Sequence, residues 1–224
     1  MTLNLKQIVA EKAVDEFVKD GMTVGLGTGS TAYYAIKRVG ELIGKVWKLR
    51  CVATSVQTEE IAKEFKIDVI DLDEADHIDV TIDGADEADP DMQLIKGLGG
   101  ALLREKIVAS VSREEVIVVD DSKLVEKLGT KSPLPVEVLI FGHKKTKIAL
   151  EKQRCTAVLR TKGDVPFVTD GGNYIYDCNF GSIDNPFFLE SRINVIPGVV
   201  ENGLFLNMAT AVVVASADGT VRML

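Results

Sequence analysis

Cysteine is scarce in this sequence, and its scarcity limits the kinds of site that the chain can build. Only Cys51, Cys155 and Cys178 occur among 224 residues, and they are widely spaced and odd in number. This distribution argues against a disulfide framework and against a zinc site made from paired cysteines. We expect three ordinary thiols, buried or half-buried.

Long apolar runs are also absent. No stretch of about 18 apolar residues occurs, and the first residues, MTLNLKQIVAEK, contain no uninterrupted apolar segment of the kind found in secretion signals. Neither membrane insertion nor secretion is therefore indicated. A cytoplasmic location is the expectation.

Positive charge is sparse as well. The chain has 34 acidic against 26 basic residues, a net charge of −8, and its one short basic cluster is His143-Lys144-Lys145. Such a chain would repel nucleic acid, so no nucleic-acid partner is expected, and an anionic small molecule would need a local cationic pocket. The sequence has no internal repeat. Its apolar content of 46% is enough to bury a substantial core, and its length of 224 residues suggests one large domain, or one large domain with a smaller one.

Apolar periodicity changes repeatedly along the first 130 residues. It predicts helices over residues 3–19, 32–43, 58–65 and 101–111, and strands over 23–27, 51–54, 69–72, 78–82 and 116–119. Strands that alternate with helices form mostly parallel sheets with helices on both faces. The expected fold class is therefore α/β, with a doubly wound, Rossmann-like sheet.

Two prolines in Ser132-Pro133-Leu134-Pro135 interrupt this alternation and mark a boundary. Beyond it we predict strands over 136–141 and 156–161, a pair of strands near 168–177 around the turn 170–173, and helices over 144–153 and 186–194. This order indicates a small α+β domain with an antiparallel sheet. The apolar runs 204–206 and 211–215 are expected to return to the first sheet. The predicted domains are 1–131 plus 203–224, and the insert 132–202.

A glycine-rich loop follows the first predicted strand. Gly27, Thr28, Gly29, Ser30 and Thr31 precede a helix, where free N–H groups and the helix dipole favour an anion. The spacing also fits a dinucleotide fingerprint, but that motif needs an acidic residue after the second strand, which ends here in Thr54-Ser55. A phosphate monoester is the favoured ligand, and a tight turn without a ligand is the alternative.

Acidic residues gather where the strand 78–82 ends. Asp83 and Asp86 fall at the carboxyl end of the strand, where open α/β sheets bind their ligands. The neighbouring Glu87, Asp89 and Asp91 are expected to be solvated charges in a turn. A metal site is disfavoured because the spacing lacks the register of a calcium loop and His77 is the one histidine nearby.

A second glycine-bearing turn follows Lys96. Gly97, Gly99 and Gly100 permit close approach of the backbone to a substrate, and Glu105 lies in the helix that follows. A lysine and a glutamate near such a turn can act as an oxyanion stabiliser and a general base. The alternative is a surface ion pair without catalytic function.

Seven segments together resemble ribose-5-phosphate isomerases of type A. They are GLGTGSTA, ATS, DGADE, KGLGGALLREK, the DDSK at 120–123, SPLPVEV and INVIPGVVENGLF. The resemblance runs from the first helix to near the C-terminus and so covers almost the whole chain. The resemblance implies an enzyme that interconverts D-ribose 5-phosphate and D-ribulose 5-phosphate in the non-oxidative branch of the pentose phosphate pathway. It further implies no metal, no organic cofactor, no membrane partner, and assembly into homodimers or homotetramers.

The resemblance also implies roles for single residues. Glu105 becomes the base that moves a proton between C2 and C1 through an enediolate, and Lys96 stabilises the oxyanion. Asp83 and Asp86 contact the ring oxygen and hydroxyls, with Asp83 assisting ring opening. The phosphate or sugar would be held by Thr28, Ser30, Thr31 and Lys123, with the glycines of both loops as further substrate-binding positions.

The sequence departs from the family pattern at two points. Leu98 stands in a turn that the family usually builds from glycines alone, and Gly97, Gly99 and Gly100 remain around it. The family also tends to place a phosphate-contacting lysine in the first helix, where this chain has Lys6 and Gln7. Two other functions remain as alternatives: a sugar-phosphate-sensing domain without catalysis, and a nicotinamide-dependent oxidoreductase.

Overall fold

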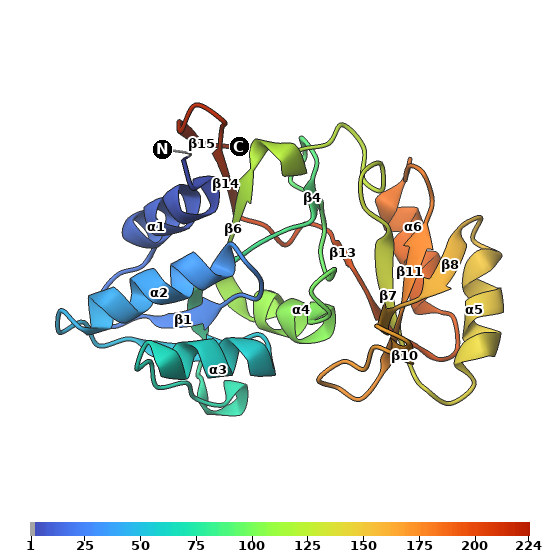
Figure 1. Cartoon of the computed structure of the whole chain (residues 1–224), viewed down its shortest axis with the longest axis horizontal. Coiled ribbons are helices and arrows are strands. Elements are labelled where there is room, and N and C mark those ends of the chain that lie inside the picture. The colour runs from blue at the N-terminus through green and yellow to red at the C-terminus, as the bar shows by residue number, and fades with distance from the viewer. Residues whose placement is uncertain (1–2) are drawn as a thin grey trace. The chain divides into compact units, whose positions relative to one another are not determined.

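The computed structural model describes residues 3–224 and consists of two compact units that alternate along the chain (Figure 1). The first unit comprises Met1–Ala85, Arg104–Leu124 and Asn207–Leu224, and the second comprises Asp86–Leu103 and Val125–Leu206. The chain therefore leaves the first unit and returns to it twice.

The first unit contains a six-stranded sheet in the order β15-β14-β6-β3-β1-β2. Its strands are β1 (Thr23–Leu26), β2 (Arg50–Ala53), β3 (Ile78–Asp83), β6 (Ser112–Asp120), β14 (Ala211–Ala215) and β15 (Val221–Met223). All pairings are parallel except that of β14 with the edge strand β15. The helices α1 (Leu5–Phe17), α2 (Ala32–Ile43) and α3 (Val56–Glu64) accompany it, and α4 (Leu102–Ser110) begins in the second unit's segment. The predicted α/β class with a doubly wound, mostly parallel sheet is confirmed.

The strand order creates a switch point between β1 and β3. From β1 the chain moves to β2 at one edge of the sheet and then to β3 on the other side of β1. Leu26 of β1 is in register with Ile82 of β3, so the two strands end side by side. Open α/β sheets bind ligands at such points, outside the carboxyl ends of the strands. Here those ends lead into the glycine loop and into Asp83.

The core of the first unit explains the apolar runs in the sequence. The strands β1 and β14 are buried along their whole length, as parallel strands covered on both faces must be. The helix α1 buries Val9, Ala10, Ala13 and Val14, which recur at helical spacing. Burial of these side chains, rather than intrinsic propensity, fixes the helix against the sheet.

The second unit is built from antiparallel strands. Its four-stranded sheet has the order β12-β7-β11-β8, with β7 (Leu134–Val138), β8 (Thr156–Leu159), β11 (Tyr174–Asn179) and β12 (Val199–Asn202). A second sheet joins β4 (Glu87–Ala88), β5 (Leu94–Ile95) and β13 (Leu204–Phe205), and β9 (Thr161–Lys162) pairs with β10 (Val165–Pro166). The helices are α5 (His143–Glu151) and α6 (Pro186–Asn194).

The division between the units differs from the expected boundaries at 132 and 202. Residues 86–103 and 125–131 also belong to the second unit, because β5 pairs there with β13 on one side and with β4 on the other, and Val125 N–H donates to Ala88 O. The carboxylate of Glu87, 0% exposed, accepts hydrogen bonds from the N–H groups of Gly129, Lys131 and Ser132 at 2.6, 2.6 and 2.5 Å. The expectation that Glu87 is solvated is therefore wrong.

Three parts of the strand prediction differ from the structure. Residues 69–72 form an isolated bridge from Val69 to Cys51 and a 3₁₀ turn, Leu72–Glu74, instead of a strand. Of the two strands expected near 168–177, the second is present as β11, but residues 170–173 form a turn before it and no strand precedes that turn within 168–173. The short hairpin of this region is instead β9 with β10, joined through Gly163 and Asp164. The run 204–206 pairs with β5 in the second unit and does not return to the first sheet.

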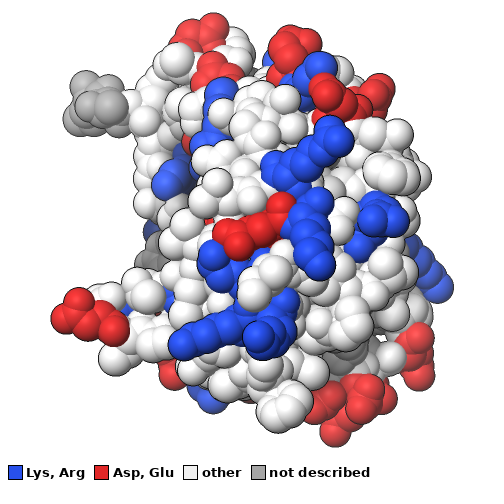
Figure 2. All heavy atoms as spheres, turned by 90° about the vertical axis from the view of Figure 1, so that its right-hand side faces the viewer, with Lys and Arg blue, Asp and Glu red and all other residues white. Residues whose placement is uncertain are grey.

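The short basic cluster of the sequence lies on α5. Lys144, Lys145, Lys152 and Arg154 on this helix and the turn after it are exposed, and Figure 2, which views the molecule from the side of α5 in Figure 1, shows lysine and arginine side chains gathered on that face. Among residues 3–224 no helix is long and apolar enough to cross a membrane.

Candidate active site

In the first unit, the glycine loop of residues 27–31 is hydrogen-bonded to the side chain of Asp83. The Asp83 side chain is 1% exposed, and its Oδ1 accepts hydrogen bonds from Thr28 N–H at 3.0 Å and Gly84 N–H at 2.7 Å. A Cβ atom on Gly27 would lie 2.2 Å from the same Oδ1. Residue 27 must therefore be glycine for the loop to reach the carboxylate.

Three further hydroxyl groups surround the side chain of Thr28. Its Oγ1 lies 2.8 Å from Thr54 Oγ1, 2.8 Å from Ser55 Oγ and 3.1 Å from Thr58 Oγ1. A hydroxyl has one donor and two acceptor positions, so these contacts use its hydrogen-bonding capacity. The ATS segment at the end of β2 thus anchors the loop, a function that sequence reasoning missed because it depends on the pairing of β1 with β2.

Lys6 of α1 reaches the other end of the glycine loop. Its Nζ donates to Ser30 Oγ at 2.8 Å, whereas Gln7 donates to Glu11 within its own helix. An open pocket of about 420 Å³ lies here, lined by Lys6, Gly29, Ser30, Tyr33, Tyr34, Gln57 and Ile61. Of the two first-helix residues that stand in place of the family's lysine, Lys6 is the one at the loop. Thr31 is the N-cap position of α2, so the positive end of the helix dipole adds to the lysine charge.

Glu105 and Lys123 complete the predicted residues of the first unit. Glu105 lies in the first turn of α4 and is 4% exposed, so the alternative of a surface ion pair does not apply to it. Lys123 is half-buried in a 3₁₀ turn, Asp121–Lys123, directly after β6. β6 pairs with β3, so Lys123 follows the same carboxyl edge of the sheet as Asp83.

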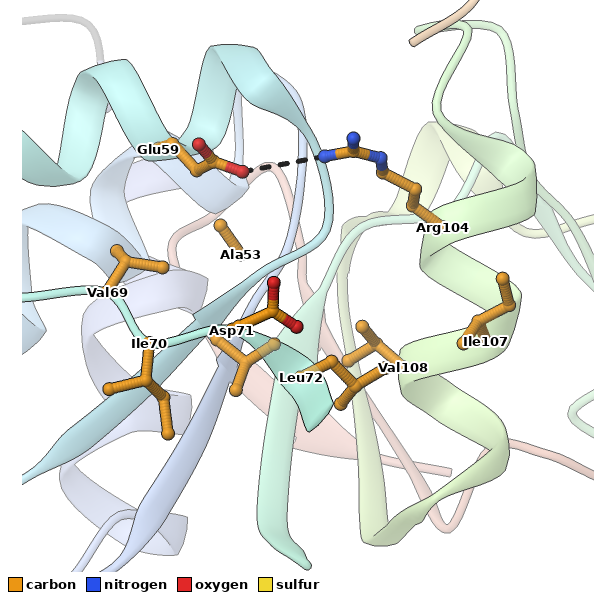
Figure 3. Close-up of a pocket in the computed structure, with 10 residues that line it drawn as sticks. Ala53, Glu59, Val69, Ile70, Asp71, Leu72, Arg104, Ile107 and Val108 are labelled. Atoms are coloured by element: carbon orange, nitrogen blue, oxygen red, sulfur yellow. Dashed lines mark hydrogen bonds and ion pairs between the residues drawn. The ribbon is translucent and has the colours of Figure 1, made fainter. Parts of the chain in front are cut away.

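Arg104, the neighbour of Glu105, faces a different pocket of the first unit. This pocket, of about 280 Å³, is lined mainly by apolar side chains of β2, the 69–72 segment and α4. In Figure 3, Arg104 and Glu59 face each other across it, with Nη1 3.5 Å from Oε1, and Ile107 and Val108 project from α4. No sequence motif indicated this pocket.

In the second unit, Asp86 holds the turn that follows Lys96. Its Oδ2 accepts a hydrogen bond from Leu98 N–H at 2.9 Å, and the turn closes through Gly100 N–H to Gly97 O at 3.0 Å. Gly97 and Gly100 have φ of +105° and +88°, conformations that favour glycine, whereas Leu98 is not among the non-glycine residues with positive φ in the described chain. The leucine therefore occupies a position of the turn that does not require glycine.

Lys96 is buried within the second unit. Its side chain is 2% exposed, and its Nζ lies 5.3 Å from the centroid of the Phe205 ring. The backbone is fixed by Lys96 N–H donating to Gly203 O at 2.9 Å. The alternative of a solvated lysine that pairs with Asp89 or Asp91 is therefore wrong. The negative face of the ring attracts the ammonium and helps to stabilise it in this buried position.

The predicted site residues thus fall on both units. The first unit contains Gly27, Thr28, Gly29, Ser30, Thr31, Asp83, Glu105 and Lys123, and the second contains Asp86, Lys96, Gly97, Gly99 and Gly100. Within residues 3–224 no group of three or more histidine, cysteine, aspartate or glutamate side chains could hold a metal ion. The predicted residues provide carboxylates, lysines, hydroxyls and backbone amides.

In the first unit, a glycine loop that precedes a helix lies beside the buried Asp83 at the switch point of the sheet. This arrangement is typical of α/β proteins that bind a small molecule at the carboxyl edge of the sheet. The particular family follows from comparison with known proteins. Residues 50–219 match the family model described as ribose 5-phosphate isomerase A (phosphoriboisomerase A). The chain belongs to this family.

Individual relatives match along almost the whole chain. The ribose-5-phosphate isomerase A of Bacillus mycoides strain KBAB4 is 48% identical over 218 residues, which cover 97% of this chain and 98% of the relative. The solved ribose 5-phosphate isomerase from Plasmodium falciparum is 43% identical with a TM-score of 0.95, and 98% of this chain and 97% of that chain are covered. A solved D-ribose-5-phosphate isomerase in complex with phospho-erythronic acid is 42% identical with a TM-score of 0.94 at the same coverage.

Proposed function

We propose that the protein is an aldose-ketose isomerase that interconverts D-ribose 5-phosphate and D-ribulose 5-phosphate. The observation that supports this most directly is the burial of two opposite charges, Glu105 and Lys96, in a chain of this family. A domain that only senses a sugar phosphate needs neither a buried base nor a buried ammonium. The reaction needs both, because a proton next to a carbonyl is removed while negative charge develops on oxygen.

In the proposed mechanism, Glu105 removes the proton from C2 of the open-chain aldose. The electrons of the C–H bond form the C1–C2 double bond, and the C1 carbonyl oxygen becomes an enediolate oxygen that the Lys96 ammonium stabilises. Glu105 then returns the proton to C1, while the hydroxyl proton at O2 passes to O1, and the carbonyl is now at C2. Each step uses only groups of this chain and of the substrate.

Ring opening and binding are assigned to the remaining residues. Asp83 and Asp86 contact the ring oxygen and hydroxyls, and Asp83 assists the opening of the ring. The phosphate is bound by the loop Gly27–Thr31 together with Lys123 and, from its contact with Ser30, Lys6. The glycines at 97, 99 and 100 allow the backbone to approach the sugar. The complex of a solved relative with phospho-erythronic acid, a four-carbon phosphorylated aldonate, is consistent with such a site.

The test is a coupled assay of ribulose 5-phosphate formation from ribose 5-phosphate in excess EDTA. We expect turnover with EDTA present, because the assigned chemistry runs through Glu105 and Lys96 and needs no Lewis acid. Absence of turnover under all conditions would refute the isomerase. Loss of turnover on chelation alone, reversed by a divalent ion, would refute the metal-free mechanism and leave the activity standing.

We further propose that the enzyme works in the cytoplasm, in the non-oxidative branch of the pentose phosphate pathway, as a homodimer or homotetramer. Membership in a family of metabolic enzymes supports this assignment. Light scattering after size exclusion distinguishes the assembly states, with 24.3 kDa as the mass of one chain.

A further inference from the structure

Arg160, directly before the β9–β10 hairpin of the second unit, makes an unusual set of contacts for a residue outside the predicted site. Its side chain is 12% exposed. The guanidinium binds Asp177 of β11 through two bonds, Nε to Oδ2 at 3.0 Å and Nη2 to Oδ1. Its Nη1 donates to Gly97 O at 2.8 Å and to Leu98 O at 3.0 Å. One largely buried side chain therefore binds two successive carbonyls of the turn after Lys96.

These bonds fix the orientation of the peptide groups in the turn. Because a trans peptide is planar, its N–H points away from its C=O. The peptide that joins residues 97 and 98 is thereby held on both sides, its carbonyl by Arg160 and its N–H by Asp86. The peptide that joins 98 and 99 directs its N–H away from the guanidinium. Arg160 thus determines which face of the turn presents amide hydrogens.

The base of the hairpin supports the same turn at its far end. Phe167 N–H donates to Arg160 O at 2.9 Å, so the two residues are tied together. The ring of Phe167 closes over Gly100, where a Cβ atom would lie 2.4 Å from Cζ. A turn that contains three glycines would otherwise sample many conformations. Arg160, Asp86 and Phe167 each restrict it through the contacts described.

We propose that Arg160 is a positioning residue for the isomerisation: it acts through the Gly97–Gly100 turn and, with Asp177, keeps the turn and the adjoining Lys96 in the geometry that the reaction requires. This inference rests on the proposed function. A lysine cannot replace the arginine, because an ammonium has no planar fork that can bind a carboxylate in two places and two carbonyls at once. Misplacement of a reacting group by about 1 Å can cost on the order of 10²-fold in rate.

The experiment compares Arg160→Lys with Arg38→Lys. Arg38 in the first unit also binds a carboxylate in two places, Asp15 through Nε at 2.8 Å and Nη2 at 3.1 Å, but lies outside the assigned site. We expect Arg160→Lys to lower kcat for ribose 5-phosphate by about 10- to 100-fold with KM changed less than about threefold. Affinity for phospho-erythronate should fall more than affinity for the substrate. Arg38→Lys should stay within about twofold of the parent.

The thermal unfolding midpoint of each variant shows whether a lower kcat arises in a folded protein or from loss of folding. A folded Arg160→Lys protein with kcat within about twofold of the parent would refute the inference. If that variant does not fold, Asp177→Asn decides, since it leaves Arg160 in place and removes the charge that orients it: a lower kcat supports the inference, and an unchanged kcat refutes it. A parent protein without isomerase activity would refute the proposed function itself, and this is measured first.

Discussion

The burial of Glu105 and Lys96 is the most informative observation at the scale of single residues. A buried charge costs free energy unless it is compensated, and structural roles for such groups are commonly better filled by apolar side chains. Arg104, the neighbour of Glu105 on α4, shows the usual arrangement of a charged side chain: it is partly exposed and forms an ion pair with the partly exposed Glu59. The two buried charges are therefore the first targets for mutation.

Glu105→Gln should lower kcat by at least about 10²-fold, because a positioned general base contributes about 10² to 10⁴ and an amide cannot take the proton. Substrate affinity should change little, since the shape is kept. Glu59→Gln, a half-buried glutamate on α3 of the same unit, is the control and should retain activity. Near-normal kcat in Glu105→Gln would move the search for the base to Asp83.

Lys96→Met should lower kcat and kcat/KM together by about 10² to 10³, as the loss of an oxyanion-stabilising group does. The charge on the enediolate oxygen develops only during the reaction, so binding of the substrate itself should change less. Lys127→Met is the control, an exposed lysine of the second unit that pairs with Asp184 at 2.7 Å. Unaltered kcat together with unaltered phospho-erythronate affinity would exclude Lys96 from the mechanism.

Local sequence motifs predicted the candidate site residues that lie close together in the chain. They did not predict the distant residues that hold the two glycine-bearing loops in place. DGADE and KGLGGALLREK contain Asp83, Asp86, Lys96 and Glu105, and all of them belong to buried or hydrogen-bonded segments. The contact of Lys6 with Ser30 spans 24 residues, and that of Arg160 with Gly97 spans 63. Such contacts depend on the pairing of distant strands, and no local pattern of residue types encodes them.

At the scale of elements, long periodic segments were predictable and short strands were not. The predicted helices 32–43 and 186–194 agree with α2 and α6 because their apolar spacing and N-terminal residues are local signals. The two-residue strands β4, β5 and β13 are too short to show alternation. Residues 69–72 have the composition of a strand, but they lie beside the edge strand β2 and pair with it only through the bridge of Val69 to Cys51, in which Ile70 N–H donates to Cys51 O.

The junction of β1 with its loop gives a prediction at this scale. Gly27→Ala should destabilise the protein by about 1 to 3 kcal/mol and impair activity, because the new methyl group would occupy the space of the Asp83 carboxylate. Gly44→Ala is the matched control, with φ of −60° and its nearest neighbour at an ordinary 3.4 Å. Chemical unfolding and the isomerase assay measure the two effects. If Gly27→Ala were as stable as Gly44→Ala, the glycine loop would have to shift and accommodate the methyl group without cost, and the prediction would be wrong.

At the scale of the whole molecule, stability should depend on a carboxylate within the sheet of the second unit. Glu137 on β7 accepts bonds at Oε1 from Thr169 Oγ1 at 2.8 Å and Asn173 Nδ2 at 2.9 Å. Burial raises its pKa above the ordinary value, the two hydrogen bonds oppose the shift, and the charges of Asp170 and Glu201 add to it. A raised pKa in the folded state means that ionisation of Glu137 destabilises the fold.

The sign of the pH dependence follows from this shift. The contribution of Glu137 to the free energy of unfolding is fully present below the ordinary glutamate pKa and is lost as the pH rises through the raised value. Glu137→Gln should therefore be more stable than the parent at pH 7.5 and should differ less at pH 4, as measured by urea unfolding. Glu126→Gln, at an exposed position, should show no such difference. A variant that is less stable at pH 7.5 would contradict the prediction.

The position of β14 has a consequence for synthesis of the chain on the ribosome. β14 pairs with β6 in the finished sheet, yet roughly ninety residues, including most of the second unit, are translated between the two strands. At about 5 to 20 residues per second, β6 waits on the order of 5 to 20 seconds for its neighbour. During that interval its apolar edge can pair with another nascent chain. Translation speed and chaperone access while residues 121–210 are being made should therefore influence how much of the protein reaches the native state.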